Sequence, residues 1–220
     1  MDQTDRLLNL LNGSSNPNPA DAVLDRIRVV VGDITQPEPD WQIDAIVNAA
    51  NPQLAGGSGV DGAIHAAAGA DQLLAYNQQH HPNGVGTGLA VRTPAFNLEA
   101  RGIRHILHTA GPVWEHQGLP PDKLGDTRED NLLASAYMRC LDLAAEHKIT
   151  GLAFPAISTG VYGFPKPRAA RIAFAHVHGT LLRADLPKHV VFVCFSQDDA
   201  EHYREAIQTR HEWMLARKRV

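Results

Sequence analysis

Short apolar runs rich in β-branched residues alternate with longer helical patterns along most of this 220-residue chain. The apolar runs predict six strands, at residues 27–31, 45–47, 88–93, 106–109, 152–157 and 190–195. The patterns between them predict helices at residues 60–79, 128–147, 168–183 and 199–217. Because crossover helices bury their apolar stripes against a sheet, this order predicts an α/β fold, a three-layer α/β/α sandwich with a six-stranded mixed sheet.

The beginning of the chain differs from the rest. Residues 12–19 consist only of the loop formers Asn, Gly, Ser and Pro. We therefore expect residues 1–20 to be an N-terminal appendage and residues 21–220 to form a single domain. A hydrophobic fraction of 44% and a charged fraction of 20% are ordinary for a globular protein.

Charge and cysteine content argue against several classes of protein. The net charge of −4 does not favour a general electrostatic grip on nucleic-acid phosphates. Both cysteines, Cys140 and Cys194, lie in apolar surroundings, so no disulfide framework is expected. No apolar run approaches the roughly 20 residues needed to cross a bilayer. We expect a soluble, cytoplasmic, monomeric protein with no membrane partner.

The segment from Asn48 to His65 follows an apolar run and leads into a helical pattern, which predicts a strand, a glycine-rich loop and a helix start. Four glycines between positions 56 and 62 allow a ligand close to the backbone. Asn48 and Asn51 offer donors and acceptors suited to ribose hydroxyls, and Asp61 can orient or deprotonate a water. The structural alternatives are Asp61 as a helix N-cap and both asparagines as turn formers beside Pro52. Their occurrence together with the glycines favours function.

A second candidate is Asp33, which follows a predicted strand and Gly32. Its carboxylate can accept a hydrogen bond from an exocyclic amine such as that of adenine, and the backbone N–H of Ile34 can donate to a ring nitrogen. The alternative is an aspartate that caps the next turn. The sequence alone leaves both interpretations open.

The third candidate runs from Ser158 to Phe164, between a predicted strand and a helix that starts near Lys166. Its hydroxyls, its glycines and the helix N-terminus make a cradle for phosphate. Tyr162 and Phe164 can stack on a sugar or a base. An ordinary strand-to-helix turn with a Ser or Thr cap is the alternative, but it does not explain the aromatic pair.

Other chemistries lack their motifs. No glycine-rich loop ends in Gly-Lys-Ser/Thr, and the glycines from 56 to 62 do not match the dinucleotide fingerprint. The paired histidines lack cysteine or carboxylate companions at ligand spacing, so no metal and no cofactor is expected. Ser158 has neither a Gly-X-Ser-X-Gly context nor a histidine nearby in sequence, so phosphate contact is a better role for it than nucleophile.

Together these motifs resemble those of macrodomains, specifically the MacroD-type branch that hydrolyses ADP-ribose esters. The resemblance covers roughly residues 27 to 195, and the motifs occur in the family's order. Ser58 interrupts a run of four glycines that is usual in the family, and residues 88–96 lack its Gly-Tyr turn. The matching segments are Gly32-Asp-Ile-Thr35, Asn48-Ala-Ala-Asn51, Gly56-Gly-Ser-Gly-Val-Asp61-Gly-Ala-Ile-His65, Thr109-Ala-Gly-Pro-Val-Trp114 and Ile157-Ser-Thr-Gly-Val-Tyr-Gly163.

The resemblance implies a pocket for ADP-ribose. Asp33 would take the adenine amine, and residues 158–162 would wrap the diphosphate. Asn51 and Asp61 are the implied catalytic residues, the first positioning the distal ribose and the second holding or activating water. The implied substrate-binding residues are Asp33, Ile34, Asn48, Gly57, Ser58, Gly59, Val60, Ser158, Thr159, Gly160, Val161, Tyr162 and Phe164.

The resemblance further implies a hydrolase that removes mono-ADP-ribose from Asp and Glu side chains and also deacetylates O-acetyl-ADP-ribose. A carboxylate is a good leaving group, so no strong general acid is demanded. Two alternatives stay open: a reader module that binds ADP-ribose without turnover, and a hydrolase of ADP-ribose linked to a nucleobase. The expected partners are ADP-ribose and mono-ADP-ribosylated proteins, and nucleic acid is expected only if it carries ADP-ribose.

Overall fold

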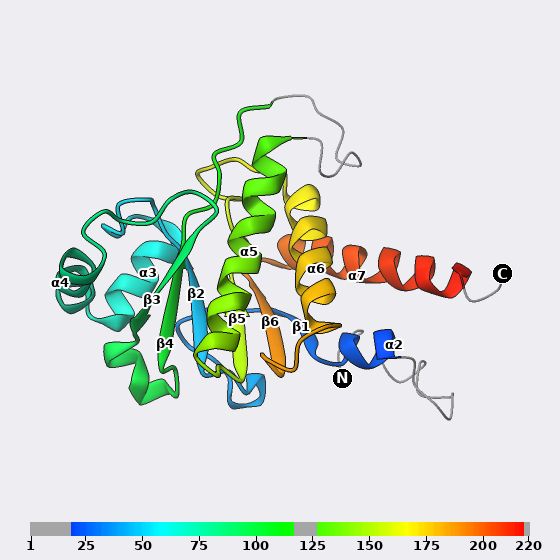
Figure 1. The fold of residues 1–220 in the computed structure, drawn as a ribbon, viewed down its shortest axis with the longest axis horizontal. Helices are drawn as coiled ribbons and strands as arrows, with labels where there is room; N and C mark the ends of the chain where they lie inside the picture. Colours follow the sequence, from blue (N-terminus) through cyan, green and yellow to red (C-terminus); the bar gives the residue numbers. More distant parts are fainter. Residues whose placement is uncertain (1–18, 117–126, 218–220) are drawn as a thin grey trace.

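The computed structural model describes residues 19–116 and 127–217, and their six strands form one sheet in the order β1-β6-β5-β2-β4-β3 (Figure 1). All neighbouring strands run parallel except β3, which pairs antiparallel with β4 at one edge. The six-stranded mixed sheet predicted from the apolar runs is confirmed. The strands are β1 Ile27–Val31, β2 Ala45–Ala49, β3 Ala90–Pro94, β4 His105–Thr109, β5 Gly151–Phe154 and β6 His189–Cys194.

Some strand ends differ from the sequence prediction. β5 ends at Phe154 because Pro155, which has no backbone N–H to donate, follows it. β3 starts two residues later than predicted because Gly88 has a φ of 80°, which strand residues do not adopt. β6 ends at Cys194, so Phe195 lies beyond the sheet.

Helices cover both faces of the sheet. α5, α6 and α7 pack on one face, and Figure 1 shows α5 and α6 side by side in front of the strands. α3 and the 3₁₀ helices η1 and η2 pack on the other face, which completes three layers. The helices are α2 Pro19–Leu24, η1 Pro39–Trp41, α3 Gly59–Ala68, α4 Ala70–His80, η2 Phe96–Arg101, α5 Arg128–Glu146, α6 Lys166–Leu181 and α7 Gln197–Arg217.

Residues 60–79, predicted as one helix, form two. α3 ends and α4 begins at Gly69, whose φ of 96° and ψ of 93° lie outside the helical region. Asn97 of η2 packs so closely that a Cβ on Gly69 would lie 2.9 Å from its Nδ2 atom. The single-helix prediction was wrong because alanines favour helix on both sides of Gly69, and a lone glycine in a helical pattern is usually tolerated.

Most of the predicted N-terminal appendage lies outside the described residues, which begin at Pro19. α2 leads directly into β1, and its Val23 and Leu24 join the main apolar cluster. The domain division at residue 20 therefore stays a prediction. In the described part of the chain, no helix combines the length and the apolar character needed to span a membrane.

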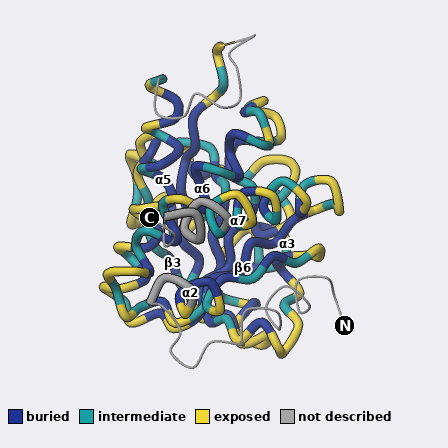
Figure 2. Tube along the Cα trace, turned by 90° about the vertical axis from the view of Figure 1, so that its right-hand side faces the viewer, coloured by how far each residue is buried: buried dark blue, intermediate teal, exposed yellow. Residues whose placement is uncertain are grey.

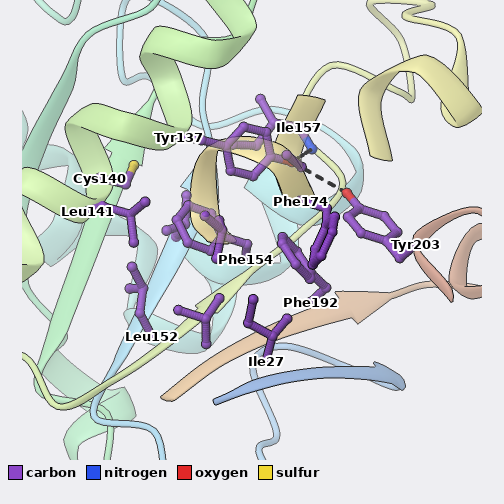
Figure 3. Packing of buried hydrophobic residues seen from close by; sticks show 14 of the residues in the cluster. Ile27, Tyr137, Cys140, Leu141, Leu152, Phe154, Ile157, Phe174, Phe192 and Tyr203 are labelled. Atoms are coloured by element: carbon purple, nitrogen blue, oxygen red, sulfur yellow. Dashed lines mark hydrogen bonds between the residues drawn. The ribbon is translucent and has the colours of Figure 1, made fainter. Parts of the chain in front are cut away.

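Two apolar clusters hold the layers together, one on each face, and the buried segments in Figure 2 run through the middle of the molecule. The larger cluster joins the sheet to α5, α6 and α7. Figure 3 shows Tyr137, Phe154 and Phe192 packed within it, and the hydroxyls of Tyr137 and Tyr203 lie 3.4 Å apart. Both layers are thus anchored to the sheet by side chains that alternate along the strands.

This alternation decides where the polar residue of β2 points. Ala45 and Val47 belong to the larger cluster, whereas Ile46 belongs to the cluster on the α3 face. Asn48 continues the alternation and faces α3, the helix that carries Asp61. Strand geometry therefore brings the first asparagine of the glycine-rich segment against the aspartate.

Candidate active site

The loops that follow β2, β4 and β5 surround a cavity of about 310 Å³ at the carboxyl ends of the parallel strands. Open α/β sheets bind their ligands at this end. Two predicted segments that are far apart in the sequence, the glycine-rich loop and the loop after β5, face the same cavity. Its lining residues are Ala49, Ala50, Asn51, Gly57, Ser58, Gly59, Val60, Asp61, Gly111, Ala156, Ser158, Gly160, Val161 and Tyr162.

Asp61 is buried at the edge of this cavity, in the first turn of α3. Asn48 Nδ2 donates to its Oδ1 atom at 2.7 Å, and Asn51 Nδ2 donates to its Oδ2 atom at 3.4 Å. His65, one turn further along α3, places Nε2 3.5 Å from the Asp61 Oδ1 atom. Two carboxamides therefore orient a carboxylate in a wall shielded from bulk water, where a polar contact is stronger than in solvent.

The structure excludes the structural alternatives for Asp61 and Asn48 but confirms a turn-forming role for Asn51. Asp61 is not the N-cap of α3, because Ser58 occupies that position. Asn48 lies within β2 and forms no turn. Asn51 does hold a turn, since its Nδ2 donates to Gly56 O at 2.7 Å and its Oδ1 accepts from a backbone N–H of the same loop at 3.2 Å. Asn51 thus shapes the glycine-rich loop and lines the cavity at the same time.

The N-terminus of α3 opens onto the cavity. The exposed hydroxyl of Ser58 makes no capping hydrogen bond, and Gly59 and Val60 line the cavity beside it. The N–H groups of a first helical turn and the helix dipole favour a polar or anionic group there. Gly57 keeps the approach to Asp61 open, because a Cβ on Gly57 would lie 3.2 Å from the Asp61 Oδ2 atom.

The loop from Ser158 to Tyr162 forms the facing wall. Ser158 has a φ of 67°, and Phe164 N donates to its carbonyl at 2.9 Å, which closes the loop on itself. Within the described part of the chain, no acceptor pairs with the backbone N–H groups of Gly160, Val161 and Tyr162. Successive N–H groups of this kind, followed by the N-terminus of α6, make an anion-binding concavity.

The segment after β4 supports this loop. Trp114 N donates to Tyr162 O at 2.8 Å. Gly111 packs against Ser158, and a Cβ on Gly111 would lie 2.1 Å from the Ser158 Oγ atom. That hydroxyl is buried, and no residue of the described chain pairs with it. A donor is therefore held ready in the wall of the cavity.

Five predicted binding residues do not line the cavity, and four of them face the protein interior or the backbone. Asn48 lies behind Asp61, and Ile34 is buried on the α3 face. The hydroxyl of Thr159 donates to a backbone carbonyl at 3.0 Å. Phe164 is buried against Trp114, with ring centroids 4.7 Å apart. A direct contact of these four with a ligand stays a prediction.

The fifth is Asp33, which follows β1. Its Oδ1 atom accepts from Thr35 N at 2.9 Å and from Thr35 Oγ1 at 2.8 Å, and its Oδ2 atom accepts from Gln36 Nε2 at 3.1 Å. The turn-capping interpretation is therefore observed. Burial acts to raise the pKa of Asp33, but these hydrogen bonds and the charge of Arg101 outweigh it and hold the pKa below its ordinary value. The side chain is an exposed carboxylate with lone pairs free for a further donor.

Phe195 is a candidate that the sequence prediction missed. It is 94% exposed just after β6, whose last residue, Cys194, pairs with Val31 at the end of β1. Phe195 and Asp33 therefore lie beyond the carboxyl ends of adjacent strands. The sequence hides this role because Phe195 ends an apolar run, which predicts a strand residue.

Four features meet around one cavity: a largely parallel α/β sheet, an anion-binding loop, a helix N-terminus and a carboxylate held by two amides. They define an α/β sandwich with a concavity suited to an anionic group at its strand ends. In residues 19–116 and 127–217, no group of three or more His, Cys, Asp or Glu side chains is arranged to hold a metal ion. The chain belongs to the Macro domain family, whose model matches residues 47–173.

Known proteins agree with this assignment. The chain is 46% identical over 184 residues to a Macro domain-containing protein of Methanosarcina mazei, covering 84% of this chain and 89% of that protein. It is 45% identical over 185 residues to the O-acetyl-ADP-ribose deacetylase of Escherichia coli, covering 83% and 95%. The resemblance inferred from the motifs is confirmed.

Solved structures show the same fold. A variant of the Oceanobacillus iheyensis macrodomain with ADPR superposes with a TM-score of 0.71 at 38% identity, covering 84% of this chain and 92% of that one. The Trypanosoma brucei macrodomain in complex with ADP-ribose gives a TM-score of 0.70 at 35% identity, covering 86% and 72%.

Proposed function

We propose that this protein is a hydrolase that releases mono-ADP-ribose from acidic side chains of proteins and deacetylates O-acetyl-ADP-ribose. The observation that carries the proposal is the buried carboxylate of Asp61, oriented by Asn48 and Asn51 at the edge of the cavity. A module that only reads ADP-ribose needs the anion-binding loop but not this carboxylate. The name of the Escherichia coli relative supports ester hydrolysis as the reaction.

The strand order supports one orientation of the ligand. Asp33 and Phe195 follow β1 and β6, the Ser158 loop follows β5, and the glycine-rich loop follows β2. These four strands are neighbours in that order, so three inter-strand spacings, roughly 14 Å, separate the two ends. We place adenine against Asp33 and Phe195, the diphosphate on the loop of residues 158–162, and the distal ribose beside Asn51.

The chemistry needs only one carboxylate and one water. Hydrolysis consumes the water and releases ADP-ribose together with a free carboxylate, which is an acidic side chain or acetate. In this orientation the Asp61 Oδ2 atom, beside the space left by Gly57, accepts a hydrogen bond from the water and takes its proton as the water oxygen bonds to the ester carbonyl carbon. The bond from that carbon to the ribose oxygen then breaks, and the proton passes from Asp61 to the ribose oxygen. Asn51 fixes the ribose, and the partners are mono-ADP-ribosylated proteins.

A turnover assay across three linkages tests the proposal. Wild-type protein is incubated with a glutamate-ADP-ribosylated protein, with O-acetyl-ADP-ribose and with base-ADP-ribosylated DNA. We expect release from the first two and none from DNA. Tight ADP-ribose binding without release from any substrate would instead favour a reader module, and release from DNA alone would favour a nucleobase-linked hydrolase.

Phe195→Ala is expected to weaken ADP-ribose binding by ~10-fold, because base–aromatic stacking contributes roughly 1–3 kcal/mol per base. Titration calorimetry measures the Kd, and Phe195→Trp, which keeps an aromatic face, is expected to bind as wild type does. Leu182→Ala is the matched control, since Leu182 is a second exposed apolar residue at the end of α6. An unchanged Kd for Phe195→Ala would contradict the adenine position.

Gly111→Ala is expected to weaken ADP-ribose binding by ~10-fold, because overpacking of this kind costs about 1–3 kcal/mol and displaces Ser158. The new methyl group would fall 2.1 Å from Ser158 Oγ and 2.6 Å from Ile157 Cγ2. The control is Gly179→Ala on α6, where the nearest side-chain atom is 4.0 Å away. Equal Kd values for the two variants would show that the position of Ser158 does not matter for binding.

A further inference from the structure

Behind Asp61, a series of hydrogen bonds runs along the α3 face of the sheet, from β3 to α3. Thr93 Oγ1 lies 3.0 Å from His108 Nε2, and His108 Nδ1 lies 3.1 Å from Asn48 Nδ2. Asn48 Nδ2 in turn donates to Asp61 Oδ1 at 2.7 Å. Thr93 and His108 are fully buried and are not among the residues that line the cavity, so ligand contact does not explain them.

The register of the strands brings these side chains together. Asn48 of β2 pairs with His108 of β4, so both point to the α3 face of the sheet. Thr93 of β3 pairs with Ile106, two residues before His108, and therefore lies on the same face. Three strands thus place polar groups in a row beside the apolar cluster on the α3 face.

At the Thr93 end of this hydrogen-bond series, the positions of the protons are fixed. The hydroxyl of Thr93 donates to Pro94 O at 2.9 Å, and its single proton is then not available for His108. His108 Nε2 therefore carries a proton and donates to Thr93. Burial lowers the pKa of His108 to about 3, with the neighbouring His65 and His81 acting in the same direction. The ring is neutral, so Nδ1 is an acceptor.

The hydrogen bonds at the Asp61 end of the series are consistent with this assignment of protons. An ionised carboxylate only accepts, so Asn48 turns its amide nitrogen and not its oxygen toward Asp61. The two protons of that nitrogen serve Asp61 and His108 Nδ1 together. A hydrogen-bond pattern that is consistent from both ends holds the carboxamide in one orientation.

We propose that His108, held in a single tautomer by Thr93, is a positioning residue that fixes the Asn48 carboxamide and, through it, the Asp61 carboxylate. The inference rests on the proposed function, in which Asp61 acts on water. A proton on His108 Nδ1 would face the amide protons of Asn48 and turn the carboxamide. Its oxygen would then repel the carboxylate and move it away from the water.

The test acts on Thr93, because direct replacement of the fully buried His108 endangers folding. Thr93→Val keeps the shape and removes the hydroxyl, and we expect kcat to fall by ~10-fold, the lower end of effects seen for groups that orient a reactive residue. The Kd for ADP-ribose is expected to stay within about 2-fold, since this is a loss in the reaction and not in binding. Thr93→Ser restores the hydroxyl and is expected to recover most of the rate.

Thr109→Val is the matched control. Thr109 is equally buried. Its hydroxyl donates to Leu89 O at 2.8 Å and takes no part in the hydrogen-bond series that leads to Asp61. The same substitution there is expected to lower stability as Thr93→Val does while leaving kcat unchanged. Equal kcat values for Thr93→Val, Thr93→Ser and Thr109→Val would overturn the proposal.

Nitrogen-15 NMR of the histidine rings gives a readout that does not depend on turnover. We expect His108 to be neutral with the proton on Nε2 in wild type, and the Nδ1-protonated form to appear in Thr93→Val but not in Thr109→Val. An Nδ1 proton or a charged ring in wild type would overturn the positioning role. If wild type releases no ADP-ribose from any substrate, the proposed function fails, while the NMR result still decides the state of His108.

Discussion

Asp61→Asn is expected to lower the rate of ADP-ribose release by ~100-fold or more, the range that a positioned acid or base contributes to catalysis. The substitution keeps the size of the side chain and its place in the first turn of α3, but it removes the charge and the basic oxygen beside Gly57. ADP-ribose affinity is expected to stay within a few-fold of wild type, because the loop of residues 158–162 is untouched. Single-turnover release from a glutamate-ADP-ribosylated protein measures the rate, and calorimetry measures the Kd.

Asp71→Asn is the matched control for this prediction. Asp71 also lies in the first turn of a helix, α4, but it is exposed and does not line the cavity. The control is expected to release ADP-ribose at the wild-type rate. If Asp61→Asn does the same, Asp61 is not catalytic, and water activation falls to a phosphate of the substrate.

Arg168→Met is expected to lower the free energy of unfolding by ~3–5 kcal/mol, because breaking a buried ion pair leaves a charge without its partner. Arg168 is fully buried, its Nε donates to Asp130 Oδ1 at 2.7 Å, and its Nη2 donates to Asp130 Oδ2. The guanidinium also lies 5.3 Å from the ring centroid of Trp114, which supports the loop of Tyr162. Urea unfolding measures the loss, and weaker ADP-ribose binding is expected alongside it.

The exposed pair of Arg139 and Asp142, 3.2 Å apart, supplies the control. Surface pairs contribute ~0–1 kcal/mol, so Arg139→Met is expected to unfold close to wild type. A similar small loss for Arg168→Met would show that the buried pair is not a major source of stability. Replacing both Arg168 and Asp130 by apolar residues is expected to recover part of the loss, because no charge is then left alone.

The free energy of unfolding at acid pH distinguishes an ion-pair effect of Arg168 from a simple packing effect. Burial acts to raise the pKa of Asp130, but hydrogen bonds from Arg168 and Thr127 and the charge of Arg168 outweigh it and hold the pKa below its ordinary value. The stabilisation is therefore complete above the unfolded-state pKa of about 4 and is lost as the pH falls through the lower folded-state value. The difference between wild type and Arg168→Met should shrink over that window, and a difference independent of pH would contradict the electrostatic explanation.

Much of the fold could be predicted because its signals are local. Each strand is a short apolar run, and the alternation of strands with helices predicts three layers. Asn51 and Asp61 could also be paired in advance, since one short glycine-rich loop joins them. Gly69 shows the limit of such local signals: it breaks the helix where it packs closely against Asn97, which comes from η2 and is distant in the sequence.

The remaining parts of the site depend on strand pairing, which no local pattern gives. His108 meets Asn48 only because β4 pairs with β2 in one register, and Thr93 joins them only because β3 runs antiparallel to β4. Phe195 becomes a candidate only when the sheet ends one residue before it. In each case the residue type is evident from the sequence, but the residues that lie next to it in the fold cannot be predicted from it.

Ser58 sits at the start of α3 and yet makes no capping hydrogen bond. A serine that does cap costs about 0.5–2 kcal/mol to lose to alanine, whereas exchange of a cap residue for glycine costs only a few tenths. The stability of α3 therefore depends little on the Ser58 side chain, which lines the cavity. Position 58 can therefore hold glycine, serine or another small residue at almost no penalty in stability, so the proposed ester preference can be altered there without disturbing the fold.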